Sequence, residues 1–126
     1  LEPVVRKDVV KVLREWCRVL LPSGTLRVAV PDFGAIVNEY LEGRSLQDLQ
    51  GLLFGGQTYD YNFHHKAFDF PTLKADLLEA GFSDVTRYDW REFLPTGFDD
   101  YSRAYLPHMD FDTGRLMSLN CIAHKQ

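Results

Sequence analysis

The sequence predicts an α/β domain in which helices flank a three-stranded mixed sheet. Three observations lead to this prediction. Before a turn at 22–24, apolar residues recur every three or four positions, as in an amphipathic helix. A short β-branched run, 25–30, follows the turn directly. Two further strand-like runs, 85–89 and 116–124, follow later helical patterns. A strand that is apolar on both faces, such as 25–30, is typical of a sheet sandwiched between helices.

Composition narrows the functional classes. The chain has 126 residues, of which 45% are hydrophobic and 25% charged, and we expect a single domain over 1–126. A net charge of −4 and the lack of a basic tract argue against nucleic-acid binding. No run approaches the roughly 20 apolar residues that span a bilayer, so we expect no membrane partner. Cys17 and Cys121 lie in apolar patterns, which predicts two buried free thiols in a cytoplasmic protein.

The first helix is predicted over 8–21, with Asp8 as its N-cap. Pro22 cannot continue the helix, and Gly24 can adopt the left-handed conformation that often ends one. The strand 25–30 then stops at Pro31. The apolar face of this helix is formed by side chains three and four residues apart: Val9, Val12, Leu13, Trp16, Val19 and Leu20.

Two short helices are predicted next. Asp32 can cap a helix that ends at Gly43. Ser45 and Asp48 have the spacing of a capping box, so Ser45 is expected to begin another helix, which Gly55 closes.

The remaining elements follow a chemistry-rich loop at 57–68. Asp69 is expected to cap a fourth helix, which ends at Gly81. A second strand is predicted over 85–89. The stretch 90–113 is predicted as a long aromatic loop, a type of segment that is often functional, and the last strand covers 116–124.

Three of these stretches carry a resemblance to a known family. RVLLPSG at 18–24, LKADLLEAGFSDV at 73–85 and LMSLNCIAHK at 116–125 resemble the second half of class I S-adenosylmethionine-dependent methyltransferases. Leu21 and Ser23 depart from the family's usual Lys and Gly. The resemblance implies a partial Rossmann-like methyltransferase fold with the sheet order 5-7-6. The last strand would then lie between the other two and run antiparallel to both.

The family's cofactor motifs are missing. Its first strand leads into a Gly-rich turn, whereas this chain contains no G-x-G. The resemblance therefore implies a fragment or truncated methyltransferase that would transfer a methyl group to an unidentified small molecule. S-adenosylmethionine would be the parent cofactor, and we expect this chain alone to be inactive and to bind none. The alternative is a non-catalytic assembly or interaction module derived from the same fold.

Candidate site residues come from two sources. By resemblance, His64 and His65 would lie near the pocket mouth, where an imidazole can orient or deprotonate a substrate hydroxyl or amine. The alternative is a loop whose histidines bond to backbone. Asp32 ends a strand, at the edge where open α/β sheets bind ligands, and otherwise serves as a helix cap. Tyr61 and Tyr105 are further substrate-binding candidates, and aromatic packing over the sheet is the alternative for Tyr105.

Other chemistry is less well supported. His108 and Asp110 form an H-x-D which, with His124, formally matches an iron facial triad, but such a loose spacing arises often by chance. A catalytic pairing of Cys17 with a histidine is disfavoured by its helical pattern. We expect no metal site.

The resemblance to the second half alone implies that the family's first four strands are missing, and this predicts assembly. In the resembling fold a fourth strand covers one edge of 25–30, and its absence leaves that edge without a partner. The helix 8–21 would lose covering neighbours as well. We therefore expect a homodimer, formed through antiparallel pairing of strand 25–30 or through the face of helix 8–21.

Overall fold

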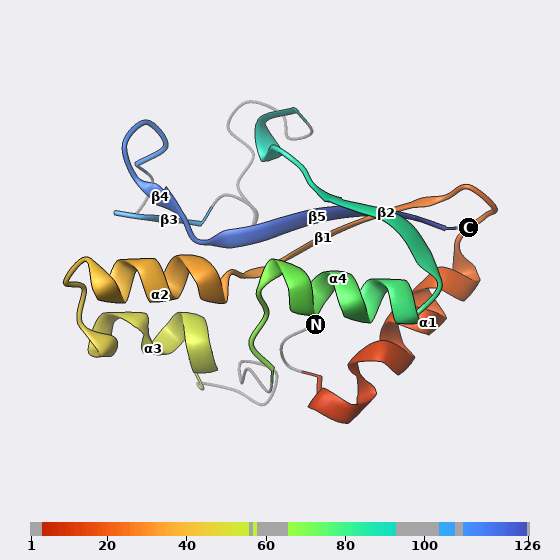
Figure 1. Ribbon diagram of the computed structural model, residues 1–126, viewed down its shortest axis with the longest axis horizontal. Helices are drawn as coiled ribbons and strands as arrows, with labels where there is room; N and C mark the ends of the chain where they lie inside the picture. The colour runs from red at the N-terminus through yellow and green to blue at the C-terminus, as the bar shows by residue number, and fades with distance from the viewer. Residues whose placement is uncertain (1–3, 56, 58–65, 93–103, 108–109, 126) are drawn as a thin grey trace.

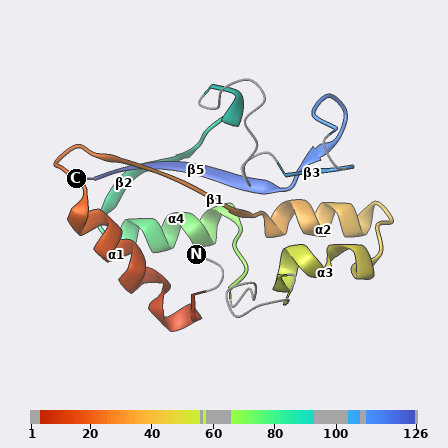
Figure 2. The same ribbon diagram turned by 180° about the vertical axis from the view of Figure 1, so that it is seen from behind.

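The computed structural model describes residues 4–55, 57, 66–92, 104–107 and 110–125. Within them, four α-helices lie on the same side of a three-stranded sheet (Figure 1). The view from behind shows the same arrangement (Figure 2). The helices are α1 (Val9–Val19), α2 (Phe33–Leu41), α3 (Leu46–Phe54) and α4 (Phe70–Glu79). The expected sandwich is therefore wrong for the described residues, because α1 and α4 cover one face of the sheet and α2 and α3 lie on the same side beyond the end of β1.

The sheet has the order β1-β5-β2, where β1 is Thr25–Pro31, β2 is Phe82–Arg87 and β5 is Ser118–Lys125. The last strand thus lies between the two earlier ones and runs antiparallel to both, as expected for these stretches. A mixed sheet was predicted, but each of these two pairings is antiparallel. Register places Val28 opposite Cys121, and both side chains belong to the core cluster that includes α1 and α4.

Smaller elements complete the described chain. The 3-10 helices η1 (Arg6–Asp8) and η2 (Trp90–Glu92) precede α1 and follow β2. Strands β3 (Tyr105–Leu106) and β4 (Arg115–Leu116) form a separate antiparallel pair. The described parts of the predicted loop 90–113 therefore contain η2 and β3.

Two clusters form the core. The larger packs α1 and α4 against the sheet, and its fully buried side chains include Leu13, Leu77 and Leu119. The smaller joins α2 and α3 to the residue before β5, through Ile36, Leu49 and Met117. No described helix is long and apolar enough to cross a membrane. Both cysteines are buried and free, as predicted.

The buried stripe of α1 differs from the predicted face. Val9, Leu13 and Cys17 are buried at intervals of four, whereas Trp16 is 37% and Val19 68% exposed. The apolar arc of this helix is wider than the strip that packs against α4 and the sheet, so its margin remains in solvent.

Three of the four predicted helix caps are confirmed. Asp32 Oδ1 accepts from the Gly34 N–H, Ser45 Oγ from that of Asp48, and Asp69 Oδ1 from that of Thr72. Asp8 makes no side-chain cap bond, because it belongs to η1 and has helical backbone angles.

Strand β2 begins three residues earlier than predicted, directly after Gly81. Asp84 adopts a left-handed backbone, with φ of 53°, and the register with β5 shifts between Ser83 and Thr86. This bulge buries both Phe82 and Val85, which breaks the simple alternation expected of a strand.

Candidate functional site

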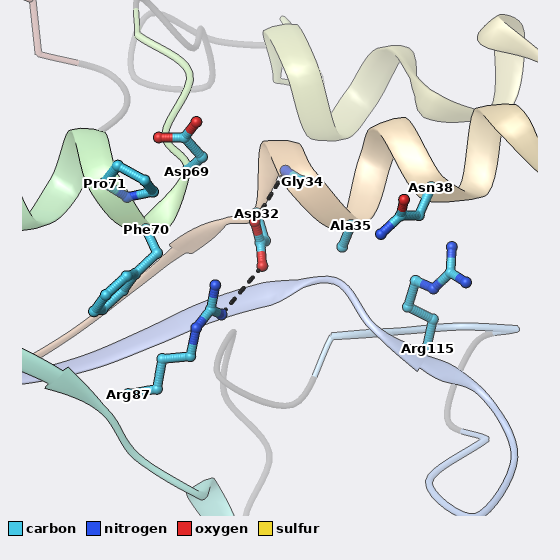
Figure 3. Close-up of a pocket in the computed structure, with 9 residues that line it drawn as sticks. All are labelled: Asp32, Gly34, Ala35, Asn38, Asp69, Phe70, Pro71, Arg87 and Arg115. Atoms are coloured by element: carbon cyan, nitrogen blue, oxygen red, sulfur yellow. Dashed lines mark hydrogen bonds and ion pairs between the residues drawn. The ribbon is translucent and has the colours of Figure 1, made fainter.

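An open cleft of about 430 Å³ lies where β1 ends and where α2 and α4 begin. The first turns of α2 and α4 form one side, and Arg87 and Arg115 approach from the side of the strands (Figure 3). Among the described residues it combines carboxylates, guanidinium groups and an aromatic ring. We take it as the candidate site.

Asp32 occupies the end of β1 and links three segments. Its backbone N–H donates to the carbonyl of Met117 over 2.8 Å, which extends the hydrogen bonding between β1 and β5 to the residue before β5. A parallel bridge joins it to Phe68, and the Phe33 N–H donates to the Phe68 carbonyl over 2.7 Å. The side chain is largely buried. One carboxylate oxygen caps α2, and the other faces Arg87. The structure thus makes Asp32 both a helix cap and a member of the cleft.

Arg87, the last residue of β2, lies across the cleft from the start of α2. Its Nη1 is 3.4 Å from Asp32 Oδ2, a long contact for an ion pair. Its guanidinium carbon is 5.0 Å from the centre of the Phe70 ring, within cation–π range. The side chain is nevertheless 55% exposed. Stacking therefore holds the guanidinium in place while leaving much of it open to a ligand.

Arg115 is held differently. Its Nη1 is 3.4 Å from Glu39 Oε2, and its Nη2 forms a close ion pair with Glu42. Glu39 also pairs with Arg44, whose Nε lies 3.1 Å from Oε1. These two arginines and two glutamates form a charge-balanced network, with Asn38 beside it on the cleft wall.

Asp69 supplies the second carboxylate of the cleft. The Thr72 side chain and backbone N–H both bond to it, and these bonds hold the pKa of the Asp69 carboxyl below its usual value of 3.8. Asp69 therefore stays negatively charged at neutral pH at the start of α4, where the helix dipole favours an anion.

The predicted catalytic residues His64 and His65, and the predicted substrate contact Tyr61, lie outside the described residues. Lys66, the next residue along the chain, is described. Its Nζ lies 2.6 Å from Asp76 Oδ2, and both side chains are largely buried. This ion pair joins the residue that follows the histidines to α4.

Tyr105 is described but does not line the cleft. It is 8% exposed within an aromatic cluster with Trp90 and Phe111, and the Trp90 Nε1–H donates to its hydroxyl over 3.3 Å. The aromatic packing considered as the alternative accounts for its position. The structure does not bring Tyr105 together with Asp32.

Sequence reasoning missed Arg87, Arg115 and Phe70. Arg87 fell inside the predicted strand 85–89, where it was not recognised as a strand end. Arg115 precedes the last strand and reaches the cleft through the β3–β4 pair. Phe70 directly follows the cap residue Asp69. An aromatic residue in the first turn of a capped helix could have indicated that this ring lines a cleft.

The comparisons with known proteins address the fold. The structure is similar to the crystal structure of a possible exported protein from Bordetella parapertussis, with a TM-score of 0.51 and 21% sequence identity. The similarity covers 94% of this chain and 33% of that protein, so the chain spans about a third of its length. No family model and no curated protein matches the chain. At this identity the likeness concerns the fold alone.

Among the described residues, no three potential metal-ligating side chains gather at one place. His108 of the H-x-D motif lies outside the described residues, and His124 Nδ1 is 3.3 Å from Thr25 Oγ1 across the sheet.

Proposed function

We propose that this chain forms the acceptor-binding part of an S-adenosylmethionine-dependent methyltransferase domain of partial Rossmann-like fold. The observation that carries the proposal is the cleft at the end of β1, built around Asp32 and the first turns of α2 and α4. Ligands of open α/β sheets bind at strand ends of this kind. The described sheet order β1-β5-β2, with the last strand between the two earlier ones, supports the proposal.

This part of the domain would contribute to catalysis by positioning the acceptor. Methyl transfer is an in-line displacement, and a protein accelerates it mainly by holding acceptor and methyl donor in the correct geometry. Asp32, Phe70 and Arg87 would hold the small-molecule acceptor. The sequence has no G-x-G turn for the donor, so we propose that this chain alone binds no S-adenosylmethionine and that a cofactor-binding half completes the site.

The proposed acid–base residues are His64 and His65, with Tyr61 as a further substrate contact. Lys66, the described residue that follows them in the sequence, forms an ion pair with Asp76 of α4, and the first turn of α4 lines the cleft, which supports the proposal. Methyl-transfer rates of the variants His64→Gln and His65→Gln in the complete enzyme test the assignment. A fall in kcat with little change in KM supports it, and unchanged kinetics in both variants removes it.

The reading frame upstream of the Leu1 codon tests the proposed function most simply. We expect it to encode a strand, an acidic residue and a G-x-G turn within about 100 residues, the size of a half-domain. A frame that starts at Leu1 or encodes an unrelated domain would overturn the enzyme proposal.

A second proposal is an assembly module in a cytoplasmic homodimer. It is favoured by the position of β1 at the edge of the described sheet and by the exposed Trp16 and Val19 of α1. The two buried thiols favour a reducing compartment.

A further inference from the structure

We propose that the cleft recognises its ligand through an oxyanion group, a carboxylate or a phosphate, held by the guanidinium of Arg87. That this ligand is the methyl acceptor rests on the proposed function; the binding itself does not. The two arginines that line the cleft differ in how far carboxylates pair their charge.

The positive charge of Arg115 is already paired with carboxylates of the protein. Glu39 and Glu42 both contact it, and Arg44 balances the second glutamate. An added anion at Arg115 would meet two carboxylates within the same network. The Arg115 side of the cleft is therefore unsuitable for an anionic group.

Among the described residues, the carboxylate that Arg87 contacts is that of Asp32, at a long 3.4 Å, and more than half of the Arg87 side chain is exposed. Five N–H donors in a planar fork suit a carboxylate or phosphate, which they can bind bidentately. The Phe70 ring stacks on this fork and so reduces the side-chain freedom that binding would remove. Arg87 is thus a preorganised donor whose N–H groups are largely unused by the part of the chain that the structure describes.

The surrounding charges favour an anion at Arg87. The carboxylates of Asp32 and Asp69 each cap a helix, where the partial positive charge of the helix N-terminus offsets about half a unit charge. Lys74 Nζ lies 5.9 Å from the centre of the same Phe70 ring and adds a second cation near that ring. Counted with this offset, the four charged groups named here sum to a partial positive charge around Phe70, in a protein whose net charge is −4.

The cleft also accommodates an apolar body beside the anion. Phe70 and Pro71 form its wall next to Arg87, and a volume of about 430 Å³ lies within the usual range for small-molecule sites. An aromatic ring bearing a carboxylate or phosphate fits this combination. Benzoate and phenyl phosphate are suitable probes, and benzamide is the neutral match for benzoate.

Titration of the chain with each probe, followed by backbone-amide NMR shifts, tests the proposal. We expect saturable shifts around the starts of α2 and α4 with benzoate or phenyl phosphate, and binding at least about tenfold weaker with benzamide, because the charge-assisted bonds are lost. The stronger of the two anions tells whether the site prefers a carboxylate or a phosphate. Affinity should fall as salt is raised.

Variants locate the anion. Arg87→Gln should weaken benzoate binding about tenfold or more, and Arg87→Lys, which keeps the charge but not the fork, should lie between. Arg18→Gln, on the exposed face of α1, is the matched control and should bind as the parent does.

Equal affinity for benzoate and benzamide, or unchanged anion binding in Arg87→Gln, would overturn the proposal. If Arg87→Gln does not fold, Arg87→Lys and the benzamide comparison decide. The upstream reading frame does not bear on these titrations, so each proposal can fail separately.

Discussion

The backbone N–H of Phe33 donates to the carbonyl oxygen of Phe68 over 2.7 Å. This bond joins the first residue of α2 to the segment that leads into α4, across 35 residues of chain. The Phe68 side chain is meanwhile 1% exposed in the main core. One residue therefore fixes the relative position of the two helix starts that border the cleft, and its loss should affect both stability and binding.

Phe68→Ala should lower the free energy of unfolding by about 3–5 kcal/mol, because it opens a cavity under the cleft. Urea unfolding measures the change. Phe54→Ala is the control, since that ring is 50% exposed and should cost about 1 kcal/mol or less. Similar losses in the two variants would mean that Phe68 does not hold the core as described.

Asp69→Ala should destabilise the protein by about 1 kcal/mol at pH 7 through loss of the α4 cap. The folded-state pKa of Asp69 is lowered by its bonds to Thr72, so the charge contributes stability above the unfolded value of 3.8. That contribution is lost as pH falls through the lowered folded pKa. Thermal unfolding between pH 7 and pH 2 should show the difference between parent and Asp69→Ala shrinking in acid. Asp69→Asn keeps a capping side chain and should be milder at pH 7; a pH-independent difference for Asp69→Ala would contradict the assignment.

Cys121 should be unreactive in the folded protein. Its side chain is fully buried, and burial raises the pKa of its thiol from 9.0 to about 11, so the reactive thiolate is scarce near neutral pH. In a Cys17→Ala variant, which leaves Cys121 as the single thiol, Ellman's reagent at pH 8 should react only after urea is added. Because the raised pKa favours the protonated thiol, the stability it contributes is present below pH 9 and lost as pH rises towards 11. Fast reaction of the folded variant would contradict this burial.

The dimer proposal yields a test at one backbone donor. The Asp32 N–H and the Gly24 carbonyl both form hydrogen bonds on the β5 side of β1. Backbone groups of successive residues in a strand point to opposite edges, so the Ala29 N–H points to the outer edge of β1. Pro31, now part of β1, also lies on that side and has no N–H, which restricts pairing to the earlier residues. We expect sedimentation to give a dimer at micromolar concentration, Ala29→Pro to shift it to monomer, and Ala29→Val to leave it intact. A monomeric parent would refute the dimer, and a dimeric Ala29→Pro with the fold intact would refute edge pairing.

The elements with strong local signals were predictable. Ser45 and Asp69 have side chains that bond to a backbone N–H three residues later, so the chain itself marks where α3 and α4 begin. The start of β2 was not predictable, because the bulge at Asp84 replaces alternation with a pattern set by tertiary packing.

Among the described residues that line the cleft, Asp32 was the one predicted as a site residue. Arg87 and Phe70 are 17 residues apart and come together because α4 and β2 fold back on one another. No local pattern marks a stacked pair of that kind. Tyr105, proposed from its loop, instead fills an aromatic cluster whose partner Trp90 lies 15 residues earlier in the chain.

Binding of S-adenosylmethionine by calorimetry, compared between this chain and the protein made from its complete reading frame, tests the central claim most directly. The account predicts no saturable binding by the chain of 126 residues, which has no Gly-rich turn, and micromolar binding by the product of the complete frame. Micromolar binding by the chain alone would contradict the assignment of the donor site to another half. Absence of binding by the complete product would contradict the methyltransferase proposal itself.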